Sequence, residues 1–521
     1  MLSRPSATYF VALLLWVATL VPIWTLKFFP GQDTPNHLYA VHARNRLEQA
    51  PFSTYLKAET RARTNLSFHV LMKWVEGPID LNTAHRVFLS LYLLFFLAGA
   101  LYLASATDPK RLPLGLLVMP FAFHWFVTMA FYNFLVTIPV FCFATGLLLR
   151  YPEPSWRVIT TFALLLLTAT VSHPLGSLVI GLAALAAVRD WTSRLRVCIG
   201  GFPALLLMVS ASGGLAAYHA EWPDSFKSPL FAIATAFYRF ALPFGADEAA
   251  TAIPAYVLLL FPAVVTALRY RKEPAPPAIR VAAVVLPLLF VLPEWVFNNY
   301  YIFHRIVPYL AVLVPAWANY DWLLARRKHY FALIGTLSLL ATLQFYVGAR
   351  TINAELEEYT AGISAIRGGQ TLLPLNFDPK LDESRVVKPT LHAWGYYGVA
   401  KNLVSPYLFN SDPNVPRSLL VFRDYAPNPS APAEHTPQML SSPWHRRWVG
   451  LNYGFDMDWT RFEKQGYRSI LLQACRYDYV LTWVEPQTFY GQLKRCFYPT
   501  FVKGRLVIYR NRALDKRASK S

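Results

Sequence analysis

The chain has 521 residues, of which 55% are apolar and 15% aromatic, with a net charge of +19. This composition excludes a single soluble domain, because the apolar residues fall in runs of about 18–23, long enough to cross ~30 Å of hydrocarbon as a helix. The positive charge does not indicate a nucleic-acid partner, since much of it lies in short loops between these runs, as the positive-inside rule predicts.

We therefore predict a polytopic α-helical membrane protein with about eleven transmembrane helices. The spans are expected at residues 7–29, 87–105, 112–131, 134–149, 157–172, 174–188, 197–217, 251–268, 281–297, 306–323 and 330–348. The fifth and sixth spans are short and meet at His173. One broken helix with a re-entrant element is the alternative there.

Charge predicts the orientation of these spans. With a cytosolic N-terminus, every inner loop is basic, and the short outer connections contribute only Arg305. This topology places the loops 30–86 and 218–250 and the tail 349–521 on the outer face of the plasma (inner) membrane. The inner loops carry Lys110, Arg111, Arg150, Arg157, Arg189, Arg194, Arg196, Arg269, Arg271, Lys272, Arg280, Arg326, Arg327 and Lys328.

Two domains follow from this pattern. Residues 1–348 form a transmembrane module, and residues 349–521 form an extracytoplasmic α/β domain. In the tail, short strand-like runs alternate with helix-like ones, and residues 500–509 are typical of a closing hairpin. Cys475 and Cys496 both fall in this domain, where a disulfide between them is compatible with an oxidising compartment.

The stretch Pro30-Gly31-Gln32-Asp33-Thr34-Pro35-Asn36-His37 opens the first outer loop directly after the first span. An acid and an imidazole, Asp33 and His37, beside the membrane suit acid/base chemistry or the binding of a metal or phosphate. An equally weighted interpretation is that Asp33 caps a helix that begins at Thr34 or Pro35. The two interpretations are compatible.

Further polar residues are predicted to gather at the outer face. Arg305 suits a phosphate through bidentate hydrogen bonds, with interfacial snorkelling as the alternative. Glu221 and Asp224 would complete a divalent-metal site with Asp33, or lie in an exposed acidic loop. The predicted substrate-binding residues are Arg305, His304, His173, Asn133, Arg63 and Glu294.

With these features, the chain resembles the GT-C superfamily of integral membrane glycosyltransferases, and more closely the loosely characterised bacterial membrane proteins grouped with them. The first-loop acid, the tight outer hairpins and the C-terminal outer domain carry the resemblance. It implies transfer of a sugar from a polyprenyl-phosphate donor to a glycan, lipid or protein acceptor. Asp33 would be the base, His37 or the pair Glu221 and Asp224 would assist it or bind Mg²⁺ or Mn²⁺, and Arg305 would hold the lipid phosphate.

The first loop lacks the adjacent Asp-Glu or Asp-x-Asp pair of several branches of that superfamily, which leaves metal dependence open. Two other functions remain as alternatives. One is a non-enzymatic transporter, flippase or assembly subunit for cell-envelope polysaccharide. The other is a polymerase or ligase that transfers glycans already assembled on lipid. Paired halves with helices interrupted at the midplane, which are typical of transporters, are absent from the sequence.

Overall fold

The computed structural model describes residues 4–58, 64–211, 220–221, 229–245, 248–269, 277–293, 295–296, 301–378, 387–406, 420–423, 474–485 and 489–518. The chain divides into two compact units. We call the first, Met1–Leu26 with Arg61–Ala349, the helical unit, and the second, Lys27–Thr60 with Arg350–Ser521, the sheet unit. The loop predicted at residues 30–86 is therefore divided between the two units, since residues 27–60 belong to the same unit as the C-terminal residues.

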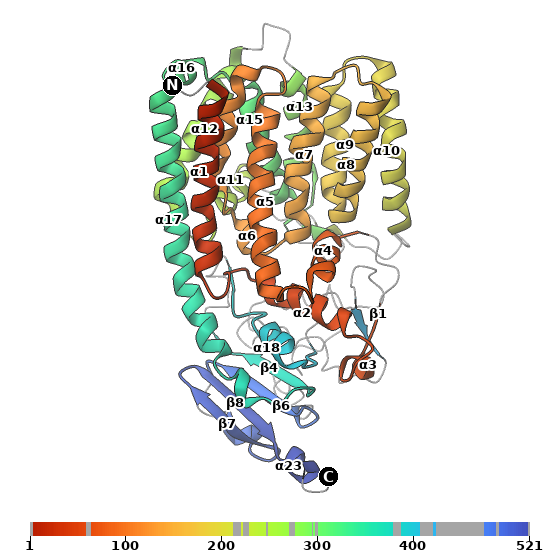
Figure 1. Ribbon diagram of the computed structural model, residues 1–521, viewed down its shortest axis with the longest axis vertical. Helices are drawn as coiled ribbons and strands as arrows, with labels where there is room; N and C mark the ends of the chain where they lie inside the picture. The colour runs from red at the N-terminus through yellow and green to blue at the C-terminus, as the bar shows by residue number, and fades with distance from the viewer. Residues whose placement is uncertain are drawn as a thin grey trace. The chain divides into compact units, whose positions relative to one another are not determined.

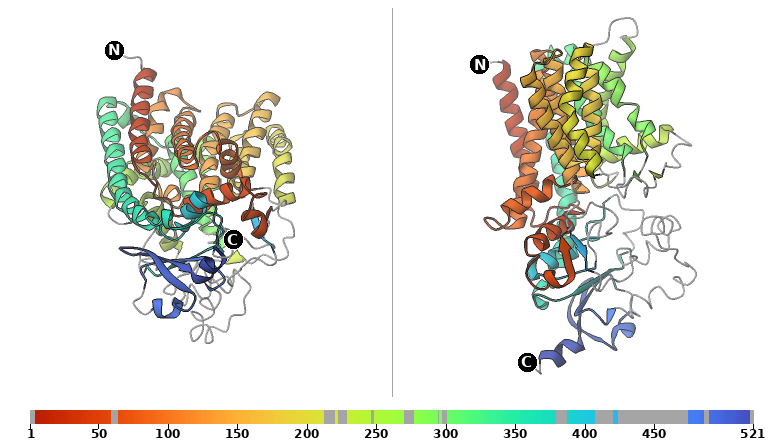
Figure 2. Two further views of the ribbon diagram at one scale, coloured as in Figure 1. Left: turned by 60° about the horizontal axis from the view of Figure 1, so that its bottom comes forward. Right: turned by 90° about the vertical axis from the view of Figure 1, so that its right-hand side faces the viewer.

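The helical unit is built from apolar helices (Figures 1 and 2). Among the described residues, six helices are long and apolar enough to cross a membrane: Pro5–Thr25, Leu81–Ala104, Tyr132–Arg150, Trp191–Ser210, Ala249–Arg269 and Arg327–Ala365. Shorter apolar helices cover Trp156–Ser172, Pro174–Ala187, Pro277–Val291 and Phe303–Trp317. The chain is thus a helical protein with several membrane-spanning candidates, and the total of eleven spans stays a prediction.

The bounds of the helices in this unit follow chain order. They are α1 (Arg4–Thr25), α4 (Ser67–Val75), α5 (Leu81–Ala104), η1 (Pro109–Phe121), α6 (Trp125–Thr128), α7 (Tyr132–Arg150), α8 (Trp156–Ser172), α9 (Pro174–Ala187), α10 (Trp191–Ala211), α11 (Pro229–Ala241), α12 (Ala249–Arg269), α13 (Pro277–Val285), α14 (Leu288–Val291), η5 (Phe303–Ile306), α15 (Val307–Trp317), α16 (Asp321–Leu324) and α17 (Arg327–Thr360). Two short strands, β2 (Ala220–Glu221) and β3 (Trp295–Val296), pair antiparallel.

Three predicted spans are not continuous α-helices. Residues 281–297 are divided between α13, α14 and β3, and residues 306–323 are divided between α15 and α16. Residues 112–131 fall on the 3-10 helix η1 and the short helix α6. Pro113 and Pro120 lie inside η1, and each removes a backbone N–H that an α-helix would use. The buried Gly115 lets η1 approach the backbone of α5, since a Cβ there would lie 2.6 Å from the Cα of Leu101. The prediction of a regular helix at this position is wrong.

The predicted turn at His173 is confirmed. Helix α8 ends at Ser172, α9 begins at Pro174, and the two helices pack against each other and against α7. Proline at the first helical position has no N–H to leave unsatisfied, so the sequence Ser-His-Pro ends one helix and starts the next. The hairpin places His173 at the turn, where its side chain can reach other parts of the unit.

The sheet unit contains a four-stranded sheet in the order β4-β6-β8-β7. Strand β4 (Leu372–Asn376) pairs parallel with β6 (Tyr479–Trp483), and the hairpin of β7 (Phe497–Lys503) and β8 (Leu506–Asn511) completes the sheet. The predicted closing hairpin is therefore confirmed. The other elements of the unit are α2 (Thr34–Asn45), α3 (Phe52–Tyr55), β1 (Leu56–Ala58), η6 (Ile363–Ala365), α18 (Trp394–Lys401), β5 (Leu420–Phe422), α22 (Tyr490–Leu493) and α23 (Arg512–Ala518).

The core of the sheet unit joins segments far apart in the chain. Buried Tyr39 of α2 packs edge-on against Trp394 of α18, with ring centroids 4.9 Å apart. The same cluster includes Leu373 of β4 and Val480 of β6. A disulfide joins Cys475 to Cys496 beside this core. Residues 27–60 are thus an integral part of the unit that the C-terminal residues build.

Candidate functional site

Asp33 stands at the N-terminus of α2, and its side chain does not cap the helix. The backbone carbonyl of Asp33 accepts a hydrogen bond from the amide of His37 at 3.0 Å. The carboxylate makes no capping hydrogen bond. An aspartate at this position normally accepts from the amides of the first turn. The helix start was predicted correctly, but the interpretation that the Asp33 carboxylate caps the helix is wrong.

Two side chains hold this carboxylate. Gln32 Nε2 donates to Asp33 Oδ1 at 3.4 Å, and His392 Nε2 lies 3.5 Å from the same oxygen. The Gln32 amide is itself fixed, because its Oε1 accepts from the backbone amide of Lys388 at 2.8 Å. The side chain of Asp33 is 13% exposed. An oriented, nearly buried carboxylate is a candidate for general-base chemistry.

Asn36 adds a polar group in the first turn of α2. Its side chain is fully buried, and neither its Oδ1 nor its Nδ2 has a hydrogen-bond partner among the residues that the structure describes. Leaving a buried amide unsatisfied costs about 1–3 kcal/mol. The side-chain amide of Asn36, three residues after Asp33, is therefore a candidate for binding a polar ligand. Sequence reasoning did not select Asn36.

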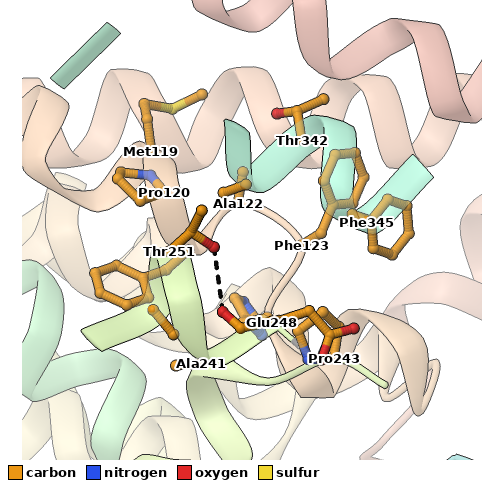
Figure 3. Close-up of a pocket in the computed structure, with 14 residues that line it drawn as sticks. Met119, Pro120, Ala122, Phe123, Ala241, Pro243, Glu248, Thr251, Thr342 and Phe345 are labelled. Carbon is orange, nitrogen blue, oxygen red and sulfur yellow. Dashed lines mark hydrogen bonds between the residues drawn. The ribbon is translucent and has the colours of Figure 1, made fainter. Parts of the chain in front are cut away.

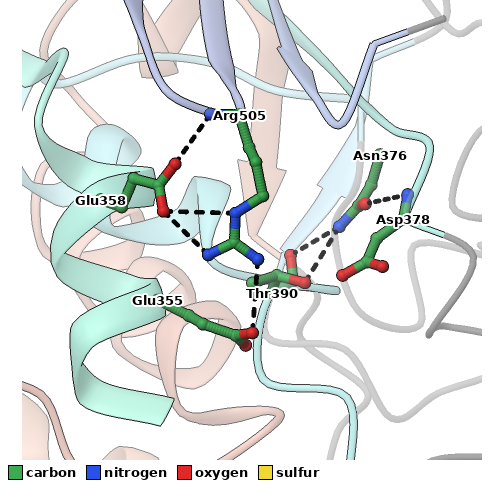
Figure 4. Close-up of polar contacts among 6 residues, drawn as sticks. All are labelled: Glu355, Glu358, Asn376, Asp378, Thr390 and Arg505. Atoms are coloured by element: carbon green, nitrogen blue, oxygen red, sulfur yellow. Dashed lines mark hydrogen bonds and ion pairs between the residues drawn. The ribbon is translucent and has the colours of Figure 1, made fainter. Parts of the chain in front are cut away.

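His392 is fixed by the segment that carries it. The side-chain amide of Asn376, at the end of β4, donates to the backbone oxygen and to Oγ1 of Thr390, both at 3.2 Å (Figure 4). The amide of Lys388 is held by Gln32. His392 thus follows two anchored residues, Lys388 and Thr390, within four positions. Sequence reasoning missed it, because no local motif marks this histidine and its link to Asp33 exists only in the folded unit.

Close packing of α18 on α2 brings His392 to Asp33. A Cβ on Gly395 would lie 2.3 Å from the backbone oxygen of Pro35, and one on Gly398 would lie 2.5 Å from the ring of Tyr39. Both glycines let the helix backbones approach more closely than any side chain would allow. The pair Asp33 and His392 therefore depends on glycine at position 395.

We expect Gly395→Ala to lower the stability of the sheet unit by about 1–3 kcal/mol, because its methyl group must displace α18 from Pro35. The contact between His392 and Asp33 would be lost with it. Thermal unfolding of the full chain measures the effect. Gly491→Ala is the matched control, since nothing lies within 4 Å of a Cβ there. Equal unfolding midpoints for the two variants would show that α18 can move away from α2 without a loss of stability.

Burial lowers the pKa of His392 from 6.5 to about 3, despite the carboxylate 3.5 Å away. The imidazole is therefore neutral at pH 7, and its contact with Asp33 is not an ion pair. A neutral imidazole can donate one N–H to the carboxylate. Because it adds no positive charge, it orients Asp33 without neutralising it.

This pKa predicts a loss of stability in acid. Between pH 6.5 and about 3 the unfolded chain binds a proton at His392 that the folded chain does not, so the free energy of unfolding falls as the pH falls through this window. We expect His392→Asn to flatten that slope, measured as the unfolding midpoint at several pH values. Replacement of the exposed His329 by Asn should leave the slope unchanged. Parallel slopes for wild type and His392→Asn would contradict the burial effect.

A second polar cluster lies in the helical unit, at the turn between α8 and α9. The Nη1 atom of Arg305 lies 2.6 Å from Nε2 of His173, and both side chains are buried. The guanidinium carbon lies 4.6 Å from the ring centroid of Phe131 and 5.3 Å from that of Phe134. Arg305 is therefore held between aromatic faces inside the unit, and the snorkelling alternative does not describe it.

His304 and Arg239 extend this cluster. Both ring nitrogens of the buried His304 lack a hydrogen-bond partner within the described part of the chain. The charges of Arg239 and Arg305 both act on His304. The guanidinium carbon of Arg239 lies 5.0 Å from the ring centroid of Tyr301. Two guanidinium groups and an unpartnered imidazole make a basic, aromatic-walled cluster that suits an anion.

Asn133 uses its polar atoms within the protein. Its Nδ2 donates to the backbone oxygen of Asn65 at 2.8 Å, and its Oδ1 accepts from the amide of Phe68, also at 2.8 Å. These bonds fix the start of α4 against the start of α7. Asn133 is therefore a positioning residue in this structure, and its predicted contact with substrate stays a prediction.

The side chains of four other predicted site residues are not described in the structure. Arg63, Glu294 and Asp224 lie outside the described residues, and Glu221 is described only as backbone in β2. Among the described residues, no group of three or more His, Cys, Asp or Glu side chains could hold a metal ion. The divalent cation and its ligands stay predictions.

A small cavity lies deeper in the helical unit. It has a volume of about 20 Å³, and Glu248, Thr251 of α12 and Phe345 of α17 are among its lining residues (Figure 3). That volume holds about one water molecule. A sugar or a lipid head group does not fit, so this cavity is not a substrate site.

Ion pairs within the sheet unit fix its architecture. Arg505, at the turn between β7 and β8, contacts Glu358 at 2.8 Å and Glu355 at 3.4 Å (Figure 4). Its guanidinium carbon also lies 4.4 Å from the ring centroid of Trp483. These contacts join the hairpin to the last turns of α17, and we assign them a structural role.

The chain matches no protein-family model, no curated protein and no solved structure.

Proposed function

We propose that this protein is a membrane glycosyltransferase that moves a sugar from a polyprenyl-phosphate donor to an acceptor on the outer face of the membrane. The observation that carries the proposal is the carboxylate of Asp33. It does not cap its helix, and Gln32 and a neutral His392 hold it in place. Because its side chain is oriented by other groups and is not used to cap α2, this carboxylate is a candidate for a chemical role.

In the proposed reaction, Asp33 takes the proton of an acceptor hydroxyl group. The acceptor oxygen attacks the anomeric carbon of the sugar and forms the new glycosidic bond. The bond from that carbon to the phosphate oxygen breaks, and the phosphate leaves with the electron pair. The neutral His392 directs its Nε2 toward Oδ1 of Asp33. The carboxylate therefore keeps its orientation and its negative charge until it accepts the proton.

The basic cluster supports a lipid-phosphate donor. The leaving phosphate gains negative charge as its bond to the sugar breaks, and preorganised cations in a water-poor site stabilise such charge strongly. Arg305 and His304 are buried, and Arg305 stands between aromatic rings. We assign them to binding of the donor phosphate, with His173 orienting Arg305.

The disulfide supports an extracytoplasmic position for the sheet unit. Cys475 and Cys496 are bonded, and disulfides persist outside the reducing cytosol. An outer position for this unit would put Asp33 on the side of the membrane where the acceptor is expected.

The proposal is tested with the full-length chain in proteoliposomes that contain polyprenyl-phosphate sugars with a labelled sugar. We expect label to move to an added glycan or lipid acceptor, with release of one polyprenyl phosphate per sugar transferred. Movement of intact labelled donor across the bilayer, without release of polyprenyl phosphate, would instead establish a flippase.

A further inference from the structure

A groove of about 370 Å³ runs between α1 and α5 on the side of the helical unit. None of the residues of the basic cluster lines it, and the proposed transfer reaction does not use it. Trp16 of α1 and Leu94 of α5 belong to its apolar wall, and Tyr102 and Arg150 belong to one end. The volume falls in the ordinary range for ligand sites.

The length of the groove along α5 is close to the thickness of one lipid leaflet. Its wall extends along α5 from Leu94 to Ser105, the residue that follows the helix, which at 1.5 Å per residue is about 16 Å. Half of a ~30 Å hydrocarbon core is about 15 Å. The groove also opens sideways, since Leu13 and Leu94 of its walls are 53% and 37% exposed. An acyl chain entering from the bilayer fits this shape.

A positive charge marks one end of the groove. The guanidinium carbon of Arg150 lies 5.1 Å from the ring centroid of Tyr102, so a cation–π contact keeps it at the mouth. Arg150 is exposed, and no ion pair joins it to a carboxylate of the described residues. An apolar groove that ends at an accessible arginine complements an anionic lipid.

This end is separate from the basic cluster around Arg305. Phe131 and Phe134, which flank Arg305, lie at the start of α7, whereas Arg150 is its last residue. The 19 residues of α7 correspond to about 28 Å, close to the thickness of the hydrocarbon core. A head group at Arg150 therefore belongs to the leaflet opposite the one that borders Arg305.

We propose that this groove binds an anionic phospholipid of the bilayer, with an acyl chain between α1 and α5 and the phosphate at Arg150. The basic inner loops predicted from the sequence place Arg150 on the cytosolic side, where anionic lipids attract basic residues. The occupant is thus a membrane lipid of the inner leaflet and not the sugar donor.

Native mass spectrometry of the purified full-length chain, titrated with dioleoylphosphatidylglycerol or dioleoylphosphatidylcholine, tests the proposal. One arginine near anionic lipid contributes about 1 kcal/mol, so we expect the wild type to prefer phosphatidylglycerol about fivefold. Arg150→Gln should lose this preference and keep its affinity for phosphatidylcholine. Arg157→Gln is the control, because Arg157 is exposed at the start of α8 and does not line the groove. If Arg150→Gln and Arg157→Gln lose the preference for phosphatidylglycerol equally, the preference comes from surface charge in general, and the proposal is overturned.

Binding of an acyl chain in the groove is tested separately, with a variant that fills the groove. Ala98 lines the groove on α5, and Ala98→Phe should weaken binding of both lipids at least fivefold. Leu164→Phe, at a position of α8 that is 62% exposed, is the control for added aromatic surface. If Ala98→Phe does not fold, Leu94→Trp blocks the same groove. Unchanged binding in a folded blocked variant overturns the site. Displacement of phosphatidylglycerol by equimolar polyprenyl phosphate would assign the groove to the donor and also overturn the proposal.

Discussion

Asp33→Asn is expected to lower sugar transfer by about 10²–10⁴-fold while leaving the unfolding midpoint of the protein unchanged. The amide is the same size as the carboxylate but cannot accept the proton of the acceptor hydroxyl, and a positioned general base contributes a factor of that order. The fold should not suffer, because the carboxylate makes no capping bond in α2. Turnover of labelled donor in proteoliposomes and thermal unfolding of the same preparation give the two readings.

A second helix-terminal aspartate provides the control. Asp80 caps α5, where its Oδ1 accepts from the amides of Asn82 and Thr83, both at 3.0 Å. Asp80→Ala should therefore lower stability by about 1 kcal/mol and leave turnover of the folded protein intact. The two variants separate a chemical role from a capping role. Wild-type turnover by Asp33→Asn would remove the base assignment.

Arg305→Ala is expected to raise the donor concentration needed for half-maximal transfer by about 10–100-fold, with little change for the acceptor. A hydrogen bond to a charged group contributes about 1.5–3 kcal/mol, which corresponds to this range. Initial rates measured against each substrate in turn separate the two dependences. An unchanged donor dependence would contradict a role for Arg305 in binding phosphate.

The conservative variant distinguishes binding from support of the fold. Arg305 is buried between Phe131 and Phe134, so Arg305→Ala also removes packing. Arg305→Lys keeps the charge but lacks the planar fork that binds two phosphate oxygens at once. We expect it to restore the donor dependence in part. Equal donor dependence in the Ala and Lys variants, together with equal loss of stability, would assign Arg305 to the fold alone.

Some features of the site could be predicted from sequence because their signals are local. The start of α2 beside Asp33 follows from Asp-Thr-Pro, and the turn at His173 follows from Ser-His-Pro. The regular helix predicted at residues 112–131 was wrong because of residues that act locally on the backbone. Apolar composition fits an α-helix there, but Pro113 and Pro120 and the close approach at Gly115 produce a 3-10 helix.

Local sequence patterns are enough to predict the apolar helical class of this protein, the closing hairpin of its sheet and the place of Asp33 at a helix start. Each depends on hydrophobic periodicity or on residues a few positions apart. Only the tertiary structure decided that Asp33 faces His392, that Arg305 faces His173 and that Asn36 is buried. Such contacts join residues far apart in the chain, and they form because helices that pack through Gly395 or turn at His173 bring them together.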